Sequence, residues 1–215
     1  MEKHLIKQIL LEQREEIRHI FKEKTIKREV ESYARKALES DLIKVIMGVR
    51  RCGKSVLAHQ LLKDRNYGYV NFDDERLIGA KTKDLNNFLE VLKEIEPDFN
   101  HLLLDEVQNI EGWELFVNRL KRRGYNIVVT GSNSKLLSKE LATHLTGRHF
   151  SLQLYPFSFA EFLLFKDVKA EEKDFYITEK RAGIKRLLEE YLRIGGLPEV
   201  FKFTLLRKTK QEEER

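Results

Sequence analysis

The amino-acid sequence predicts an α/β fold in which a parallel sheet lies between two layers of helices. Short apolar runs alternate along the chain with amphipathic stretches of helical period, as in parallel sheets covered on both faces. Hydrophobic residues make up 41% and charged residues 35% of the 215 residues, so a sizeable core fits under a polar surface. We expect strands at Ile43–Met47, Tyr67–Phe72, His101–Leu104, Asn126–Thr130 and Phe150–Leu154, and helices that begin near Lys54, Asp84, Trp113 and Ser134.

Residues 1–40 precede the first expected strand and form a charged, helix-rich segment. Apolar side chains recur there at the spacing of one helical face. This stripe consists of Ile6, Leu10, Ile17 and Phe21, with Ile9 and Ile20 beside it. We interpret the stripe as a surface that packs against the chain's own core. Docking on a partner protein, or on a second copy in a homo-oligomer, is the alternative.

The chain after the last expected strand is helical and is interrupted by charged residues. A short helix at Ala160–Phe165 is followed by a charged break over Lys166–Lys173, and the chain is again helical from Arg181. The tail, residues 207–215, is almost entirely charged and is interpreted as a solvated end or as a cut through a longer chain. We therefore expect three parts, namely an N-terminal helical segment (residues 1–40), a core (residues 41–168) and the start of a helical lid (residues 169–215).

A glycine-rich loop, Gly48-Val49-Arg50-Arg51-Cys52-Gly53-Lys54-Ser55, follows the first expected strand. It has the complete pattern G-x-x-x-x-G-K-[ST] in the strand–loop–helix context of a phosphate loop. The two glycines allow successive backbone N–H groups to point into one concavity and bind phosphate oxygens. Lys54 reaches the β and γ phosphates, and the Ser55 hydroxyl can ligate Mg²⁺. The helix continues from Val56 with its N-terminus toward the phosphates, so we expect the residues from Gly48 to Val56 to bind a nucleotide.

The run His101–Leu104 is an apolar strand that ends in two acids, Asp105 and Glu106, as in a Walker B segment. Because the carboxyl ends of parallel strands lie at one edge of a sheet, Asp105 is placed to hold Mg²⁺ through water. Glu106 is then available to polarise the water that attacks the γ-phosphate. An Asp-Glu pair alone would indicate only a turn at a strand end, and the phosphate loop makes the catalytic interpretation the favoured one.

Three further polar residues complete the candidate catalytic set with Glu106 and Lys54. Ser132 or Asn133, after the fourth expected strand, could sense the γ-phosphate or orient the attacking water. The alternative for both is capping of the next helix. Arg148, before the fifth strand, could stabilise charge on the transferring phosphoryl group, in its own subunit or in a neighbour's. A solvated arginine that makes no contact with phosphate is the alternative there.

Charge and cysteine content limit the class of function. The net charge is +5 and no long basic block is present, so a nucleic-acid partner is allowed but not required. Cys52 is the only cysteine, which excludes an intramolecular disulfide and a cysteine-based zinc site. A redox switch at Cys52 is the alternative to a small residue at a variable loop position. No apolar run is long enough to cross a membrane and no signal-peptide pattern is present, so we expect a cytoplasmic protein without a membrane partner.

Five stretches carry a resemblance that covers most of the chain, from about Asp41 to Val200. They are GVRRCGKS, LLLDEVQNIEGWE, VVTGSNSKLLSKELATHLTGR, LYPFSFAEFL and YLRIGGLPEV. Together they resemble the archaeal AAA-type ATPase family of P-loop NTPases, which is related to the STAND class. The resemblance implies a sheet with the strand order 5-1-4-3-2, ATP rather than GTP, and a helical lid after residue 170.

The resemblance also implies roles for residues outside the core. Gly196-Leu197-Pro198 is similar to the G-x-P motif that places a proline against adenine, so Pro198 is a candidate nucleotide contact. Arg28 and Glu29 lie where relatives carry an adenine-proximal Arg-rich box, and the match is partial. Arg193 is the nearest match to a sensor-2 arginine. Relatives usually continue into a further C-terminal domain, whereas this chain stops in the lid.

The sequence therefore predicts an Mg²⁺-dependent ATPase that acts as a conformational switch or motor module, with ATP and Mg²⁺ as ligands. One alternative is a nucleotide-gated binding or scaffold module with negligible hydrolysis of its own. Another is a DNA-dependent loader or helicase-like ATPase, whose binding to DNA would fall steeply with salt. A small-molecule kinase is least favoured, because the sequence contains no second substrate pocket that can be recognised.

Overall fold

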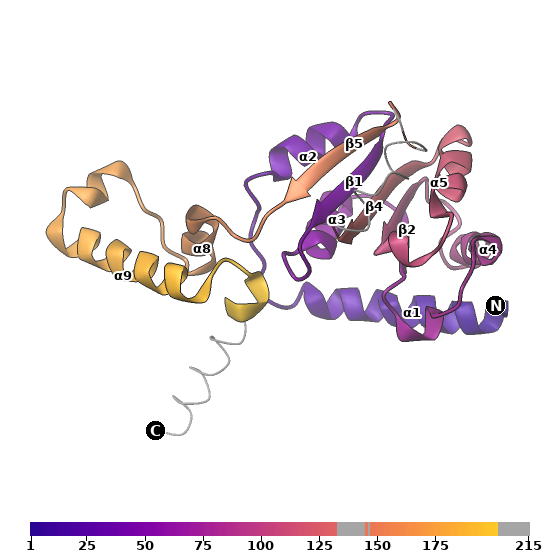
Figure 1. The fold of residues 1–215 in the computed structure, drawn as a ribbon, viewed down its shortest axis with the longest axis horizontal. Coiled ribbons are helices and arrows are strands. Elements are labelled where there is room, and N and C mark those ends of the chain that lie inside the picture. The colour runs from indigo at the N-terminus through magenta and orange to yellow at the C-terminus, as the bar shows by residue number, and fades with distance from the viewer. Residues whose placement is uncertain (133–144, 146, 202–215) are drawn as a thin grey trace, which may run out of the picture. The chain divides into compact units, whose positions relative to one another are not determined.

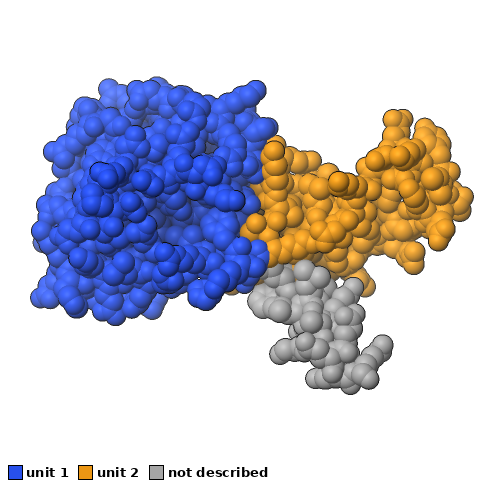
Figure 2. All heavy atoms as spheres, turned by 180° about the vertical axis from the view of Figure 1, so that it is seen from behind, with its two compact units in different colours: residues 1–23, 30–48, 54–154 blue, residues 24–29, 49–53, 155–215 orange. Residues whose placement is uncertain are grey.

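The computed structural model describes residues 1–132, 145 and 147–201, and the chain divides into two compact units. Unit 1 comprises residues 1–23, 30–48 and 54–154 (Figure 2). Unit 2 comprises residues 24–29, residues 49–53 and the chain from residue 155 onward. Most of the N-terminal helical segment thus belongs to the same unit as the expected core. The C-terminal part of unit 2 begins at residue 155, whereas the expected lid begins at residue 169.

Unit 1 is built on a parallel sheet of five strands in the order β2-β3-β4-β1-β5 (Figure 1). This is the order 5-1-4-3-2 read from the opposite edge, so the α/β class and the implied topology are both confirmed. β1 and β3 are buried along their whole length, which explains why their sequences are nearly continuous apolar runs. The strands are β1 (Ile43–Gly48), β2 (Tyr67–Asn71), β3 (His101–Asp105), β4 (Asn126–Ser132) and β5 (His149–Leu154).

Helices flank the sheet of unit 1 (Figure 1). The helices expected near Lys54, Asp84 and Trp113 are present, and the one expected from Ser134 lies outside the described residues. The α-helices of unit 1 are α1 (Lys3–Ile20), α2 (Glu31–Leu38), α3 (Lys54–Leu62), α4 (Leu85–Ile95) and α5 (Trp113–Arg122). Short 3-10 turns lie at Glu75–Leu77, Thr82–Asp84 and Val107–Asn109.

The apolar stripe of α1 is buried inside unit 1. Ile6, Ile9 and Leu10 are fully buried and belong to the main core, and Ile17 is 9% exposed. The packing interpretation is thus confirmed for these four residues, and docking of a partner protein or of a second copy through this helix stays a prediction. Phe21, at the end of the stripe, stays exposed.

Helix α1 also covers the edge strand β2 through one buried amide side chain. The Gln13 Nε2 atom donates to the carbonyl oxygen of Asn71 (3.0 Å), and the Asn71 N–H donates to Gln13 Oε1 (2.9 Å). A side-chain amide therefore replaces the missing neighbour of an edge strand, whose backbone groups would otherwise lack partners in a buried place. Gln13 is three residues after Leu10 and four before Ile17, so the helical spacing places this polar residue on the buried face of α1.

Unit 2 has a small aromatic core around helices α8 (Phe159–Phe165) and α9 (Thr178–Ile194). Ser158 and Glu161 form a capping box at the start of α8, which fixes where that helix begins. The buried members of this core are Phe157, Phe162, Phe165 and Phe201. A 3-10 turn at Glu172–Phe175 lies in the charged region before α9. Across the described part of the chain, none of the helices is both long and apolar enough to span a bilayer.

Candidate functional site

The phosphate loop joins the carboxyl end of β1 to the first residue of α3. Gly48 is the last residue of β1 and pairs in register with Ser132 of β4 and Leu154 of β5. Gly53 has a φ of 96°, a left-handed conformation that a side chain would strain, so the second glycine of the motif is required by the backbone. Arg51 also has a positive φ, 69°. Lys54 then begins the helix with its side chain only 4% exposed.

The buried ammonium group of Lys54 lies beside Glu106, the second acid of the Walker B segment. Lys54 Nζ is 3.1 Å from Glu106 Oε1, and Gln108 Nε2 donates to Glu106 Oε2 at 2.6 Å. Glu106 itself has a left-handed backbone (φ 50°, ψ 41°), which is rare for a residue with a side chain and is found preferentially at functional sites. Both carboxylate oxygens of Glu106 are therefore held in place within unit 1.

Asp105 is buried at the end of β3, and hydroxyl groups from three elements surround its carboxylate. Thr130 of β4 donates a hydrogen bond to Asp105 Oδ1, and the Ser55 and Tyr69 hydroxyls also contact the Asp105 carboxylate. Burial raises the pKa of Asp105, and the hydrogen bonds from Thr130 and Ser55 act in the opposite direction. The Thr130 hydroxyl also accepts from the Glu106 N–H at 3.1 Å, so one side chain positions both acids.

These groups fit a magnesium ion held together with a phosphate ligand. Mg²⁺ prefers oxygen ligands and is usually bound by one or two carboxylates plus substrate phosphates. Ser55 and Asp105 place a hydroxyl and a carboxylate in contact with each other, which is the pair such a site needs. Among the described residues no group of three or more His, Cys, Asp or Glu side chains could hold a metal by itself. Ser55 and Asp105 are therefore the residues that would hold Mg²⁺ in the presence of a nucleotide.

The structure places the other candidate catalytic residues at different ends of the sheet. Ser132 lies at the carboxyl edge beside Gly48, next to the phosphate loop, and Asn133 lies outside the described residues. The Arg148 carbonyl accepts from the N–H of Ile43, so Arg148 lies level with the amino end of β1. This separates Arg148 from Gly48 by the length of β1, roughly 17 Å for a six-residue strand. The alternative in which Arg148 acts on the phosphates of its own subunit does not agree with this position, because Arg148 lies at the opposite end of the strands from the phosphate loop.

The middle of the phosphate loop, residues 49–53, packs within unit 2. Cys52 is fully buried, and its carbonyl oxygen accepts from Nη1 of Arg28 at 3.0 Å. Arg51 forms a 2.9 Å ion pair with Glu199. A Cβ atom placed on Gly53 would lie 3.5 Å from Arg28 Nη1 and 4.0 Å from Pro198 Cγ. Two of the residues that the resemblance singled out, Arg28 and Pro198, are thus next to this loop.

The remaining loop residues are more open. Val49 and Arg50 are exposed, and Val56 is half-buried in the first turn of α3. The hydrogen bond from the Phe157 N–H to the Gly196 carbonyl (2.7 Å) fixes the segment that leads to Pro198. Arg193, in the last turn of α9, is exposed. The burial of Cys52 removes its thiol from solvent, so the redox-switch alternative has no support in this structure.

Sequence reasoning missed Thr130, Tyr69 and Gln108. A polar residue in the apolar run of β4 was a visible signal for Thr130, whose strand pairs in parallel with the strand that carries Asp105. Tyr69 reads as an ordinary strand aromatic, and nothing local indicates that its hydroxyl reaches Asp105. Gln108 lies in a 3-10 turn after Glu106, where a glutamine is unremarkable.

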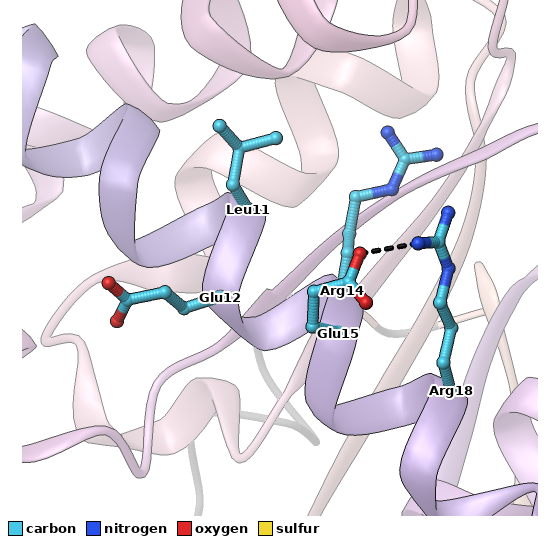
Figure 3. A pocket seen from close by; sticks show the side chains of 5 residues that line it. All are labelled: Leu11, Glu12, Arg14, Glu15 and Arg18. Atoms are coloured by element: carbon cyan, nitrogen blue, oxygen red, sulfur yellow. Dashed lines mark hydrogen bonds and ion pairs between the residues drawn. The ribbon is translucent and has the colours of Figure 1, made fainter.

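A shallow hollow elsewhere in unit 1 is a weaker candidate for a site. It lies on the outer face of α1 and is lined by Leu11, Glu12, Arg14, Glu15 and Arg18 (Figure 3). Arg18 pairs with Glu15, Glu12 pairs with an arginine of the 3-10 turn after β2, and Arg14 pairs with Glu96 at 2.9 Å. All four charged groups of the hollow therefore already have partners, and we assign it no ligand.

A parallel sheet with a phosphate loop after β1, a buried aspartate at the end of β3 and a polar residue at the end of β4 defines the class of P-loop NTPases. Comparison with known families agrees, since the sequence model of the AAA domain matches residues 40–163. The chain belongs to the AAA family of P-loop ATPases.

Two curated proteins are similar to the chain over most of its length. An uncharacterized protein of Methanocaldococcus jannaschii is 40% identical over 182 residues, which cover 83% of this chain and 40% of that protein. An uncharacterized protein of Haemophilus influenzae is 39% identical over 175 residues, which cover 75% of this chain and 41% of that protein. The chain thus spans about two fifths of the length of these curated relatives.

Solved structures share the fold at low sequence identity. DnaA from Aquifex aeolicus bound to AMPPCP matches with a TM-score of 0.52 and 16% identity, over 82% of this chain and 58% of DnaA. A structure of Hsp104 with ATPγS and casein matches with a TM-score of 0.56 and 15% identity, over 86% of this chain and 37% of that chain. These similarities concern the fold alone.

Proposed function

We propose that the protein binds ATP with Mg²⁺ and hydrolyses it, and that it acts as a nucleotide-dependent switch or motor module. The observation that carries the proposal is the juxtaposition of Lys54, Glu106, Ser55 and Asp105 in unit 1. These are the groups that phosphoryl transfer needs, since catalysis there depends on positioning and on stabilising charge. The AAA family membership supports the choice of a nucleotide as ligand.

Each residue has one task in this proposal. The loop amides and Lys54 bind the phosphates, while Ser55 and Asp105 hold the metal ion. Mg²⁺, when bound, neutralises charge on the β and γ phosphates. Glu106 polarises the attacking water, and Ser132, beside Gly48, contacts the γ-phosphate. Thr130 and Tyr69 hold the Asp105 carboxylate in a fixed orientation, which reduces the reorganisation needed when ligands bind.

Arg148 enters the proposal only as a residue given to a neighbouring copy. Its place level with the amino end of β1, at the far end of the strands from the phosphate loop, supports this choice. An arginine supplied from another subunit can stabilise transition-state charge by a large factor, about 10³–10⁵ in kcat in GTPases. Turnover per protomer would then rise with protein concentration, and Arg148→Ala would abolish that rise.

A nucleotide-gated binding module with negligible hydrolysis is the second candidate function. It is favoured by one observation, that Lys54 and Gln108 already engage both carboxylate oxygens of Glu106. These contacts leave fewer carboxylate lone pairs for a water molecule until the phosphates draw Lys54 away. Such a protein would bind ATP with Mg²⁺ and release phosphate very slowly on its own. Stimulation by DNA would instead favour the loader or helicase-like alternative.

The test measures ATP binding and phosphate release with and without Mg²⁺ on the same protein. Lys54→Ala should weaken ATP binding by about tenfold or more, because a charge-assisted contact to phosphate is lost. Glu106→Gln should retain binding and lower turnover by about 10²- to 10⁴-fold, the usual contribution of a general base. Matched controls are Lys63→Ala and Glu111→Gln, which change exposed residues outside the site.

Three outcomes separate the candidates. Absence of ATP binding by the unmodified protein refutes both. Binding without phosphate release at any protein concentration selects the gated module. Unchanged turnover in Glu106→Gln removes Glu106 from the mechanism and leaves the nucleotide-binding assignment intact.

A further inference from the structure

Unit 2 contains a buried arginine, Arg28, although arginine side chains are almost never fully buried unless they are paired. Arg28 is 6% exposed, and it lies in the short segment between α1 and α2. Its guanidinium stacks over the ring of Phe157, with 4.9 Å between the Cζ atom and the ring centroid. Burial of a cation is costly unless hydrogen bonds and an opposite charge compensate for the lost water. The groups that contact Arg28 must therefore compensate for the burial of its charge.

The compensating charge is the carboxylate of Glu161, 133 residues later in the sequence. Arg28 Nε donates to Glu161 Oε1 at 2.8 Å, and Arg28 Nη2 donates to Glu161 Oε2 at 3.1 Å. The Glu161 carboxylate also accepts from the backbone N–H groups of Glu29 (2.8 Å) and Ser158 (3.0 Å). These hydrogen bonds outweigh the effect of burial and lower the pKa of Glu161. A fixed, bidentate ion pair thus sets the plane of the Arg28 guanidinium.

The two outer nitrogens of that guanidinium reach two backbone carbonyls. Arg28 Nη2 donates to the Tyr155 carbonyl oxygen at 2.7 Å, and Arg28 Nη1 donates to the Cys52 carbonyl oxygen at 3.0 Å. The second contact is the informative one, because the peptide bond between Cys52 and Gly53 belongs to the phosphate loop. Arg28 therefore ties this loop to the segment that begins α8.

The contact determines where the Gly53 N–H points. A peptide unit is planar and, in this chain, trans throughout the described residues, so its C=O and N–H point in opposite directions. The Cys52 carbonyl is directed at Arg28, so the Gly53 N–H is directed away from it. In a phosphate loop the N–H groups must face the phosphates. A cation on the carbonyl also polarises the amide and strengthens the N–H as a donor.

We propose that Arg28 is a positioning residue for the phosphate loop, which acts through the Cys52 carbonyl to aim the Gly53 N–H at bound phosphate. Glu161 holds Arg28 in the plane that this task requires. The inference rests on the proposed function for the identity of the ligand. It differs from an adenine contact, because the group that Arg28 positions binds phosphate and would do so for a ligand without a base.

The first experiment uses inorganic tripolyphosphate and Mg·ATP as two probes of the same loop. Arg28→Met removes every donor and leaves a side chain of similar length, so the Kd for both probes should rise by about 10- to 100-fold. Arg28→Lys retains one donor group that cannot bind Glu161, Tyr155 and Cys52 together. Its Kd for each probe should therefore lie between the Kd of the wild type and that of Arg28→Met. Lys27→Met, which removes an exposed cation of the same segment, should leave both Kd values unchanged.

The second experiment follows the loop without any ligand. Cys52 is the only cysteine and is fully buried, so the rate at which a thiol reagent reacts with the native protein reports on this loop alone. Arg28→Met should raise that rate by about tenfold or more. Phe165→Leu, which alters the buried core of unit 2 without touching the hydrogen bonds of Arg28, controls for general loss of stability. It should leave the Cys52 thiol protected.

The outcomes separate failure of this inference from failure of the proposed function. If Arg28→Met raises the Kd for Mg·ATP and leaves that for tripolyphosphate unchanged, Arg28 contacts the base and the positioning role is overturned. If the thiol stays protected in both Arg28→Met and Arg28→Lys, the positioning role is overturned even if no nucleotide binds. If the wild type binds neither probe and the thiol becomes exposed in Arg28→Met, the role of Arg28 in the loop is supported and the nucleotide assignment is refuted.

Discussion

Burial of His59 should make unit 1 sensitive to mild acid. His59 lies on the inner side of α3, where its Nδ1 is 2.9 Å from the Tyr67 hydroxyl and its ring packs on Tyr69 and Phe21. Its Nε2 atom is buried without a hydrogen-bond partner among the described residues. Because no acid accompanies the ring in these contacts, burial lowers the pKa of His59 from 6.5 to about 4.

The sign and size of the effect follow from this shift. The folded state binds the proton only near pH 4, whereas the unfolded chain binds it near pH 6.5. Stability is therefore complete above pH 6.5 and is lost as the pH falls from 6.5 toward 4, because acid favours the unfolded chain. Between pH 7.5 and pH 5 the linkage amounts to about 2 kcal/mol of unfolding free energy.

Urea unfolding at these two pH values measures the effect. Trp113 is the only tryptophan, is buried, and lies in the same unit as His59, so its fluorescence reports the unfolding of unit 1. The matched variant is His59→Leu, which cannot titrate. The unfolding free energy of the wild type should fall by about 2 kcal/mol more than that of the variant between pH 7.5 and pH 5.

Subtraction of the variant removes the other groups that titrate in this range. The pKa of His101 is also lowered, mainly by burial, and that of Asp105 is raised by burial, and both contributions are common to the two proteins. The Asp74 carboxyl, with a pKa of about 2, titrates below the range. Parallel decreases in wild type and His59→Leu would refute the reasoning, since His59 would then be protonated equally in both states.

Two further predictions concern single amide side chains. Gln13→Leu leaves the backbone groups of Asn71 on the edge strand without partners, so it should cost about 1–3 kcal/mol of unfolding free energy. Gln8→Leu, an exposed glutamine of the same helix, is the control, and an equal cost in both variants would contradict the edge-capping role. Gln108→Leu removes the hydrogen bond to Glu106 and should raise the phosphate-release rate about fivefold at an unchanged KM, as one hydrogen bond of about 1 kcal/mol allows. A lower rate would mean that Gln108 holds Glu106 in its active orientation.

The sequence was sufficient to predict the sheet because the strands are short, mostly apolar and separated by stretches of helical period. Its order came from the resemblance, and the structure has that order. Strands β1, β3 and β4 run one or two residues past the expected ends, to Gly48, Asp105 and Ser132. Those residues are polar or glycine and therefore do not fit an apolar pattern, yet the ladder continues through them to the edge where the site lies.

Residues of the candidate site could be predicted only where they belong to a short sequence motif. Lys54, Ser55, Asp105 and Glu106 are recognisable because each is at a fixed spacing within a strand–loop unit. The Arg28–Glu161 pair joins residues 133 positions apart, so no local pattern indicates it. Arg148 precedes β5, and β5 runs parallel to β1, so Arg148 lies at the amino end of the strands whereas the phosphate loop lies at the carboxyl end.

The division of the phosphate loop between the compact units has a practical consequence for anyone who trims this protein. A chain cut after Leu154 would retain the whole glycine-rich motif, all five strands and both Walker acids. It would lose Glu161, Tyr155 and Glu199, which hold Arg28 and Arg51 around residues 49–53. A minimal fragment chosen from motifs alone would therefore omit the residues that give the loop its shape. We therefore expect that a fragment with the loop in its native shape must extend beyond β5.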